Sequence, residues 1–421
     1  MTLPGRRTIE VHADWHGLRG PHRMGTLYAA LGRRGELFSF EYDAQWLSSA
    51  RAQQLDPRLQ LFAGEQHPPE GSFGLFLDSA PDRWGRTLQD RREARRARAE
   101  GGRPRPLHES DYLLGVHDAH RMGALRFRTS PDGPFLDADS GRPAPPWTSL
   151  RELEAASLAL EEEGADEDPR CDEWLRLLLA PGSSLGGARP KAGVLDPHGH
   201  AWLAKFPSRA DRDDVGGWEA VVHRLARRCG VDVADADARR FGSHRHTFLA
   251  RRFDRTAAGD RIHFASAMTL LDRKDGDSHR EGASYLELAE LVARDGSRPD
   301  ADLAQLWLRI VFFMCVSNVD DHLRNHGFLL DPGRGWRLAP AYDVNPVATG
   351  DGLTLNVSET DNTLDLDLAL DVSAHFRLTK PASHELLARV RKTARGWPVE
   401  ARRLGIRPAE IDRMAPAFRL A

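Results

Sequence analysis

The pattern of hydrophobic positions changes about half-way along the chain. In the first half, short alternating runs predict strands, as at Ile9, Val11 and Ala13 and at 37–42. After Glu219, apolar residues recur at helical spacing, and we expect helices at 218–228, 285–294, 303–316 and 384–396. The pattern predicts an α/β N-terminal part, to about residue 215, followed by a mostly helical part.

Shorter elements fill the N-terminal part. The pattern predicts further strands at 123–127, 191–195 and 201–206. It predicts helices at 44–49, 74–84, 86–98, 150–162 and 171–179, the second of which ends or bends at Pro81. Residues 129–147 are rich in Pro, Gly, Asp and Ser and show no period, so we expect a loop there.

Composition narrows the class of protein. The chain has 421 residues, enough for two or three domains, and 40% apolar with 29% charged residues is typical of a soluble globular protein. A net charge of -3 argues against binding a polyanion through bulk charge. Three separated cysteines without a CxxC pair favour a reducing compartment, and we expect a cytoplasmic protein.

Neither a membrane span nor a nucleic-acid helix is the preferred interpretation of the two most suggestive runs. The apolar run 306–316 is too short to cross a bilayer and contains Arg309, so it predicts a buried helix and no membrane contact. The run 86–98 carries five arginines near its end and could touch nucleic acid. A solvated helix face is the more common meaning of such a charge run.

The segment 318–326 (NVDDHLRNH) follows the apolar run and carries the first candidate chemistry. Asp320 and Asn325 have the spacing of a kinase catalytic loop, in which the Asp receives the proton of the substrate hydroxyl and the Asn holds magnesium. Asp and Asn are common in loops, so the spacing needs support from the rest of the chain.

A glycine-rich stretch, 182–191 (GSSLGGARPK), supplies a candidate phosphate loop. Consecutive backbone N–H groups of such a loop can face a phosphate, although neither a Walker motif nor GxGxxG is present. The predicted hairpin that follows ends at Lys205, the position of a lysine that contacts ATP phosphates. Glu219, near the start of the next helix, is the candidate carboxylate that holds this lysine.

A second acid completes the predicted ATP–magnesium site. Asp343 lies 18 residues beyond Asn325, after a predicted hairpin at 327–330 and 336–339. Kinases place a magnesium-binding Asp at the corresponding position. Asn325 and Asp343, with the oxygens of ATP, make a suitable set of Mg²⁺ ligands.

Other chemistries have weaker support. His322 and His326 have the i,i+4 spacing of zinc ligands, but the chain offers neither an intervening Glu in the HExxH sense nor an obvious third ligand. We expect His322 to organise the loop through hydrogen bonds. Asp321 could be a second metal ligand or could cap a turn. Ser-His-Asp hydrolysis lacks a GxSxG elbow.

These stretches, in this order, resemble the HipA family of bacterial serine/threonine kinases, the toxins of HipBA-type toxin–antitoxin modules. The resemblance rests on SLGGARPK (184–191), AKFP (204–207), RFDR (252–255), and DDHLRN (320–325) with PAYD (340–343). Looser similarity at FLDSAPD (76–82) and DAHRMGAL (118–125) extends it over nearly the whole chain.

The resemblance implies a role for each matching residue. It implies Asp320 as catalytic base, Lys205 and Asn325 as further catalytic residues, magnesium on Asn325 and Asp343, and autophosphorylation on Ser184 or its neighbour Ser183. Residues 252–254 would form the hinge near the adenine. The implied ATP-binding residues are Ser184, Leu185, Gly186, Gly187, Ala188, Lys205, Arg252, Phe253, His322, Asn325 and Asp343.

The chain departs from the family pattern at three points, none of which removes a catalytic group. Arg-Pro stands before Lys191 where some relatives have Gln-Glu, Arg251 stands where the hinge often has Glu, and Asp321 replaces a Gly.

The implied fold is α+β and kinase-like with two lobes. Residues 1–128 would form the N-terminal α/β subdomain, 149–215 the phosphate-loop and lysine part of the kinase N-lobe, and 216–421 the helical C-lobe. The implied activity is ATP- and Mg²⁺-dependent phosphorylation of an aminoacyl-tRNA synthetase, with a HipB-like antitoxin as partner and DNA contacted only through that complex. A catalytically silent pseudokinase and a small-molecule or lipid kinase remain alternatives.

Overall fold

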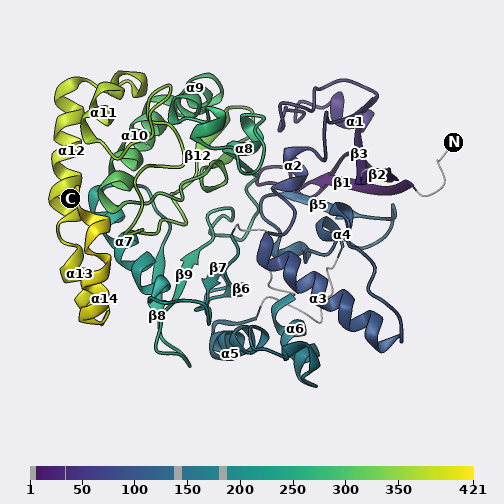
Figure 1. The fold of residues 1–421 in the computed structure, drawn as a ribbon. Helices are drawn as coiled ribbons and strands as arrows, with labels where there is room; N and C mark the ends of the chain where they lie inside the picture. The colour runs from purple at the N-terminus through teal and green to yellow at the C-terminus, as the bar shows by residue number, and fades with distance from the viewer. Residues whose placement is uncertain (1–5, 34, 137–144, 180–186) are drawn as a thin grey trace. The chain divides into compact units, whose positions relative to one another are not determined.

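The chain folds into two compact units. The computed structural model describes residues 6–33, 35–136, 145–179 and 187–421. The first unit comprises Met1–Arg209 and Asp254–Ala265, and the second comprises Ala210–Phe253 and Ser266–Ala421 (Figure 1). The chain therefore leaves the second unit after Phe253 and re-enters it within β10 (Phe264–Ser266).

A five-stranded antiparallel sheet forms the centre of the first unit, in the order β4-β3-β2-β1-β5. Its strands are β1 (Arg6–Ala13), β2 (His22–Gly32), β3 (Gly35–Tyr42), β4 (Glu65–Gln66) and β5 (Leu125–Arg128). Ile9, Val11 and Ala13 are completely buried, and their polar neighbours Glu10 and His12 are buried as well, so β1 is a strand as predicted but is covered on both faces.

The central strand β2 was not predicted from the sequence. Its residues HRMGTLYAALG mix small and polar types and show little alternation. It is a strand because it pairs on both edges, with β1 and with β3. Gly25 permits this close pairing, since a Cβ at that position would lie 2.3 Å from the carbonyl oxygen of Glu41.

The first unit also contains helices, and one of their boundaries differs from the prediction. The helices of the first unit are α1 (Ala44–Leu47), α2 (Gly74–Leu77), α3 (Arg83–Ala99), α4 (Glu109–Leu114), α5 (Leu150–Leu160) and α6 (Cys171–Leu179). The predicted helix at 74–84 is two helices, because Asp82 accepts a hydrogen bond from the Gly85 N–H (2.8 Å) and so begins α3.

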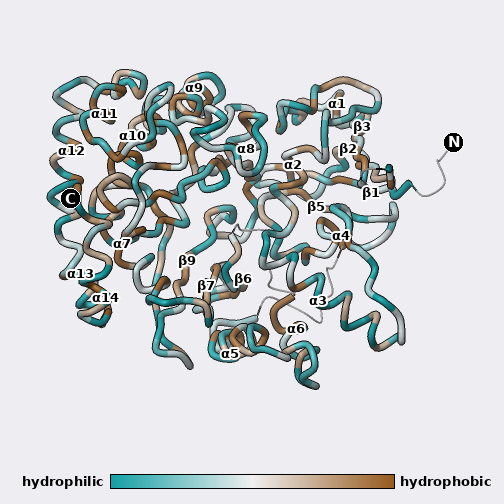
Figure 2. The backbone as a smooth tube through the Cα atoms, in the orientation of Figure 1, coloured by the Kyte–Doolittle hydropathy of each residue, from teal (hydrophilic) through white to brown (hydrophobic). Residues whose placement is uncertain are grey.

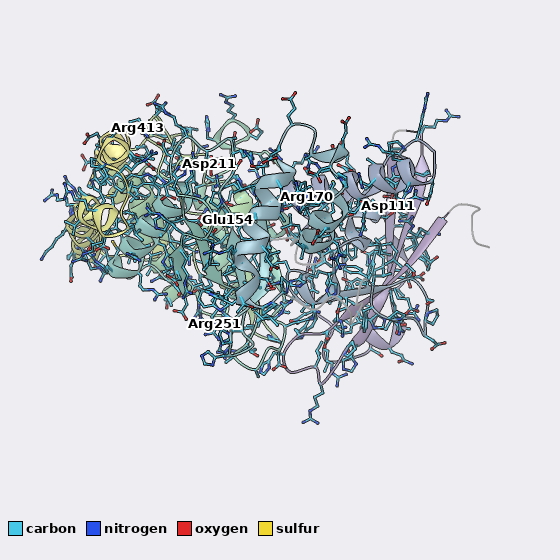
Figure 3. The ribbon with its side chains drawn as sticks, turned by 90° about the horizontal axis from the view of Figure 1, so that it is seen from below. Asp111, Glu154, Arg170, Asp211, Arg251 and Arg413 are labelled. Atoms are coloured by element: carbon cyan, nitrogen blue, oxygen red, sulfur yellow. The ribbon has the colours of Figure 1, made fainter. Side chains whose placement is uncertain are left out.

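β6 (Lys191–Leu195) and β7 (Ala201–Lys205) form the predicted hairpin, which lies in the first unit. Its turn is organised by Asp196, whose carboxylate accepts hydrogen bonds from the backbone N–H groups of His198 and His200 at 2.8 and 2.9 Å. In the same unit Asp111 of α4, labelled in Figure 3, accepts hydrogen bonds from the guanidinium groups of Arg7 and Arg105.

The second unit is mainly helical. Its helices are α7 (Val215–Cys229), α8 (Ala267–Leu270), α9 (Tyr285–Asp295), α10 (Pro299–Val316), α11 (Leu366–Asp371), α12 (Lys380–Ala394), α13 (Trp397–Arg403) and α14 (Pro408–Met414). The C-terminal helices, yellow in Figure 1, pack on α7 and α10. Figure 2 colours much of α10 as hydrophobic, and every residue from Leu306 to Val316 is buried, as predicted.

Two hairpins complete the second unit. They are formed by β8 (Ala236–Arg239) with β9 (Thr247–Arg251) and by β11 (Gly327–Asp331) with β12 (Gly335–Leu338). No helix among the described residues is long and apolar enough to traverse a bilayer. The three cysteines are buried and unpaired.

Candidate active site

The segment 317–326 begins where α10 is forced to stop. Ser317 has a left-handed backbone (φ +48°), its N–H bonds to the Met314 carbonyl at 3.3 Å, and the Asn318 N–H bonds to the Phe313 carbonyl at 2.9 Å. These are the two hydrogen bonds of a Schellman motif, which ends a helix and turns the chain away from its axis. The buried helix α10 therefore fixes where the following loop starts.

Asp320 and Asn325 are joined by the loop that both belong to. The Asn325 side-chain Nδ2 donates to the Asp320 carbonyl oxygen at 3.0 Å, and the Asn325 N–H bonds to the His322 carbonyl at 2.8 Å. Asn325 is buried, whereas Asp320 is exposed. The amide nitrogen of Asn325 thus supports the loop and leaves its amide oxygen available to a cation, while the Asp320 carboxylate remains accessible to a substrate hydroxyl.

Asp321 has a different environment from its neighbour. It is 1% exposed, and its Oδ2 accepts hydrogen bonds from the Tyr285 hydroxyl of α9 and from His326 Nε2 at 2.8 Å. Burial, together with the Asp321 carboxylate, raises the pKa of Tyr285 well above its usual value, so the phenol stays a donor. Of the two roles left open for Asp321, the structure favours the structural one: it ties the loop to α9.

Asp343 lies on a turn that follows the second hairpin. Its φ of +55° places a non-glycine residue in the left-handed region, a conformation that recurs at functional sites. The preceding residues are held by the buried Arg309 of α10, which donates to the Ala339 carbonyl at 2.6 Å, and by a hydrogen bond from the Ala341 N–H to the Asp232 carbonyl at 2.8 Å. Burial lowers the pKa of Arg309 to about 10.

Two asparagines that the sequence analysis did not single out connect this turn to the loop. The Asn345 N–H donates to Asn318 Oδ1 at 2.9 Å, and Asn345 Nδ2 donates to Asp343 Oδ1 at 3.3 Å. Within the described part of the chain, the buried atoms Asn318 Nδ2 and Asn345 Oδ1 have no hydrogen-bond partner. The only signal in the sequence was Asn345 itself, two residues after the candidate ligand.

This arrangement fits a magnesium ion. Asn325 and Asp343 offer an amide and a carboxylate oxygen, which are hard ligands of the kind that Mg²⁺ prefers, and it usually keeps several waters. The orphaned polar atoms of Asn318 and Asn345 beside them could bond to such waters. By contrast, no group of three or more His, Cys, Asp or Glu side chains in the described ranges is placed to hold a metal, which leaves zinc on His322 and His326 without support.

Lys205, in the first unit, is buried at the end of β7. It is paired across the hairpin with Lys191, a second buried lysine, whose Nζ lies 2.6 Å from the Asp82 carboxylate and 3.2 Å from the Gly187 carbonyl. Gly187 has a φ of +89°, which glycine adopts readily. Asp82 therefore neutralises one lysine of the pair and ties the start of α3 to the end of the candidate phosphate loop.

The predicted phosphate loop and the predicted lysine–carboxylate pair remain predictions. Ser183, Ser184, Leu185 and Gly186 lie outside the described residues, and Ala188 is exposed. Glu219 is buried on α7 in the second unit, and its pairing with Lys205 of the first unit remains a prediction.

The predicted hinge 252–254 spans the point where the chain passes between units. Arg252 is buried, and the ring of Phe253 lies 5.3 Å from that of Tyr342, whose hydroxyl donates to the Arg324 carbonyl at 2.7 Å. Asp254, in the first unit, accepts from the Gly123 N–H at 2.9 Å. Arg251, labelled in Figure 3, has its guanidinium 3.8 Å from the Asp235 carboxylate.

Most of the arginines of α3 form hydrogen bonds or ion pairs within the first unit. Arg95 forms a two-point pair with Asp172 (2.5 and 2.8 Å), and Arg96 bonds to Glu93 and Glu100 on its own helix. Arg91 and Arg98 donate to backbone carbonyl oxygens. The solvated and structural interpretation of this helix is therefore the better one.

Comparison with known proteins identifies the family. The profile of the HipA-like C-terminal domain matches residues 183–397, just over half of the chain. The chain belongs to the HipA-like family. The match includes Lys205, Asp320, Asn325 and Asp343, the residues on which the candidate site is built.

Three relatives that are named as candidate kinases share part of the sequence. The chain is 31% identical to Y4mE of Sinorhizobium fredii over 149 residues (34% of this chain, 33% of Y4mE) and 27% identical to Y4dM of the same organism over 272 residues (57% and 64%). It is 26% identical to a protein of Haemophilus influenzae over 184 residues (40% and 53%). The chain thus spans less than two thirds of the length of each of these relatives.

The fold agrees with this family over the whole length. HipA of Shewanella oneidensis, solved with HipB and its operator DNA, superposes with a TM-score of 0.67 over 98% of this chain and 95% of that chain. At 18% identity this shows the fold alone. The predicted α+β kinase-like fold class is confirmed.

Proposed function

We propose that this HipA-like chain is an ATP- and Mg²⁺-dependent serine/threonine protein kinase. The observation that supports the proposal most is that the two neighbouring aspartates of the loop 317–326 have different environments. Asp321 is buried, and its carboxylate accepts hydrogen bonds from two donors. Asp320 is exposed, and its backbone carbonyl accepts a hydrogen bond from the Asn325 side chain. A loop built in this way presents one carboxylate in a fixed position, which is what an in-line transfer to a hydroxyl requires.

In this proposal each residue has a defined task. Asp320 orients the acceptor hydroxyl and receives its proton as the oxygen attacks the terminal phosphorus, and ADP leaves. Asn325 and Asp343 hold Mg²⁺, which neutralises phosphate charge when bound. Lys205 contacts the α and β phosphates, and the backbone of Gly187 and Ala188 covers them.

The family resemblance supplies the proposed substrate, partner and regulation. The substrate is an aminoacyl-tRNA synthetase, whose phosphorylation would stop tRNA charging, and the partner is a HipB-like antitoxin. HipA of Shewanella oneidensis was solved with HipB and operator DNA, which supports this choice of partner. Phosphorylation of Ser184 or Ser183 would add about two negative charges where ATP phosphates bind and would switch the kinase off.

Incubation with Mg-ATP followed by mass spectrometry tests the proposal. The wild type should gain phosphate on Ser184 or Ser183, and expression of the wild type should produce protein phosphosites that are lost with Asp320→Ala. A wild type that modifies neither itself nor any protein would contradict the kinase proposal. Phosphorylated small molecules without protein phosphosites would instead favour the small-molecule alternative.

A further inference from the structure

A pocket of about 320 Å³ adjoins the candidate catalytic loop in the second unit. One of its walls is Val319, the residue immediately before Asp320, so the two Cα atoms are about 3.8 Å apart. The pocket belongs neither to the predicted ATP residues nor to the predicted magnesium ligands. Its lining residues are Ser278, His279, Arg280, Val319, Gly352, Leu353, Thr354 and Asn362.

Hydrogen bonds fix the pocket walls to the loop. Thr354 Oγ1 donates to the Val319 carbonyl at 2.7 Å, and the His279 N–H donates to the Thr354 carbonyl at 2.7 Å. On the opposite side, the Leu353 N–H bonds to the Asn362 carbonyl at 2.8 Å and Asn362 Nδ2 returns a bond to the Leu353 carbonyl at 2.6 Å. The pocket therefore keeps its position relative to Asp320.

A glycine allows two segments of the pocket lining to approach each other closely. A Cβ on Gly352 would lie 2.8 Å from Asn362 Nδ2 and 3.1 Å from the Asn362 carbonyl oxygen. Backbone and side chain therefore approach more closely here than a larger residue allows.

The lining is apolar with one cationic side chain. Val319 and Leu353 are the aliphatic residues of the lining, and the exposed Arg280 is its one arginine, with Glu281 as its neighbouring acid. His279 Nδ1 is buried without a hydrogen-bond partner in the same part. These groups suit a peptide that carries an acidic side chain.

The nearby acid feels the charge of Arg280, but its hydrogen bonds go to Ser278. Glu281 follows Arg280 in sequence, but its carboxylate accepts from both the N–H and the hydroxyl of Ser278 at 2.9 Å, forming a capping box. These bonds lower the pKa of Glu281, which keeps it ionised and engaged with Ser278. Arg280 remains the charged side chain that lines the pocket.

We propose that this pocket is the docking subsite for the protein substrate, and that it selects an acidic residue close to the phosphorylated serine. The inference rests on the proposed kinase function and deepens it. An extended peptide advances about 3.3 Å per residue, so a serine at Asp320 would place a residue a few positions away beside Arg280. Complementary charge at such a site chiefly provides specificity.

Synthetic peptides test the subsite directly. Each peptide carries one Ser on an Ala- and Gly-rich background, with one Asp placed at successive positions on either side, and a matched set carries Arg in place of Asp. With full-length wild type and Mg-ATP, we expect one Asp register to react about tenfold faster than its Arg counterpart. Arg280→Ala should reduce this ratio about fivefold, the upper range for an exposed ion pair, and Arg280→Glu should invert it.

The ratio of the Asp-peptide rate to the Arg-peptide rate is measured on one preparation. It therefore does not change if a substitution lowers the amount of folded protein. Arg334→Glu, in the exposed turn between β11 and β12, makes the same charge change and should leave the ratio unaltered. Equal rates at every register, or an Asp preference that survives Arg280→Glu, would overturn the subsite. So would a wild type that phosphorylates itself but no peptide, whereas a wild type inactive on every substrate, itself included, would overturn the proposed kinase function as well.

Discussion

Helix α3 and the candidate site around the loop 317–326 differ in how their polar groups are satisfied. The helix carries many arginines, yet Arg95 and Arg96 are paired with carboxylates and Arg91 and Arg98 with carbonyl oxygens. The candidate site instead contains two buried polar atoms without partners within the described part of the chain, Asn318 Nδ2 in the loop and Asn345 Oδ1 near Asp343. We therefore take the unused hydrogen-bonding capacity beside Asp343, and not the run of arginines, as the sign of a ligand site.

The physical reason is the cost of leaving a buried polar atom unsatisfied. Such an atom costs about 1–3 kcal/mol, whereas an exposed ion pair contributes about 1 kcal/mol or less. Surface arginines therefore have little effect on the free energy of folding, whether or not they are paired. Buried polar atoms without partners destabilise the fold, and a bound ligand with its waters would supply the missing hydrogen bonds.

The largest effect should come from Asp320→Asn, which would show that the loop carries chemistry. Replacing a general base typically lowers the rate by about 10²–10⁴-fold, and we expect a loss of that size in phosphate transfer. Asp320 is exposed, so the melting temperature should stay close to that of the wild type. Asp412→Asn, at another exposed aspartate, is the control, and equal activity of the two variants would place the catalytic base elsewhere.

Asn345→Ala should raise the magnesium requirement. Removing a group that orients a metal ligand commonly weakens metal affinity by about 10–100-fold, and Asn345 Nδ2 donates to Asp343. A Mg²⁺ titration of activity at fixed ATP measures the shift. A variant with a lower maximum rate at an unchanged Mg²⁺ midpoint would show that Asn345 does not act through the metal.

Tyr285→Phe should destabilise the second unit by about 1–3 kcal/mol, because buried Asp321 loses a donor. Urea unfolding measures this loss. Tyr112→Phe is the matched control, since its hydroxyl bonds to Asp90 at a half-buried position of the first unit and its removal should cost less. Equal losses in the two variants would contradict a special role for the Asp321 cluster.

The same substitution predicts a change in pH dependence. The folded pKa of Tyr285 is raised, so below pH about 10 the phenol is protonated in both states and its contribution is complete. Above that pH the unfolded state releases a proton that the folded state retains, and stability falls by up to about 1.4 kcal/mol per pH unit. Tyr285→Phe should therefore lose less stability than the wild type between pH 10 and 11.

Arg95→Ala should have the smallest effect, a loss of about 0.2–1 kcal/mol in the free energy of unfolding of the first unit. Phosphate transfer should be unchanged. Arg92→Ala, on the same helix at an exposed position, is the control and should be close to neutral. A marked loss of activity in Arg95→Ala would break the contrast between the helix and the loop.

The sequence determined most elements and the identity of the candidate chemistry. Alternation located the strand β1, and helical spacing located α7, α9, α10 and α12 within a few residues, because these patterns follow from local geometry. The apolar run with Arg309 is a buried helix, as expected. The spacing of Asp320, Asn325 and Asp343, together with the family motifs, was sufficient to nominate the site.

Only the tertiary structure decided how neighbouring residues differ in role. The sequence nominated Asp320 by its spacing from Asn325 but left the role of Asp321 open, because that role depends on Tyr285, which lies 36 residues before Asp321 in the chain. For the same reason it missed β2, whose strand character comes from pairing on two edges, and the Asp82–Lys191 pair. Local patterns specify which elements form, whereas long-range packing decides which polar groups are satisfied and which remain available for chemistry.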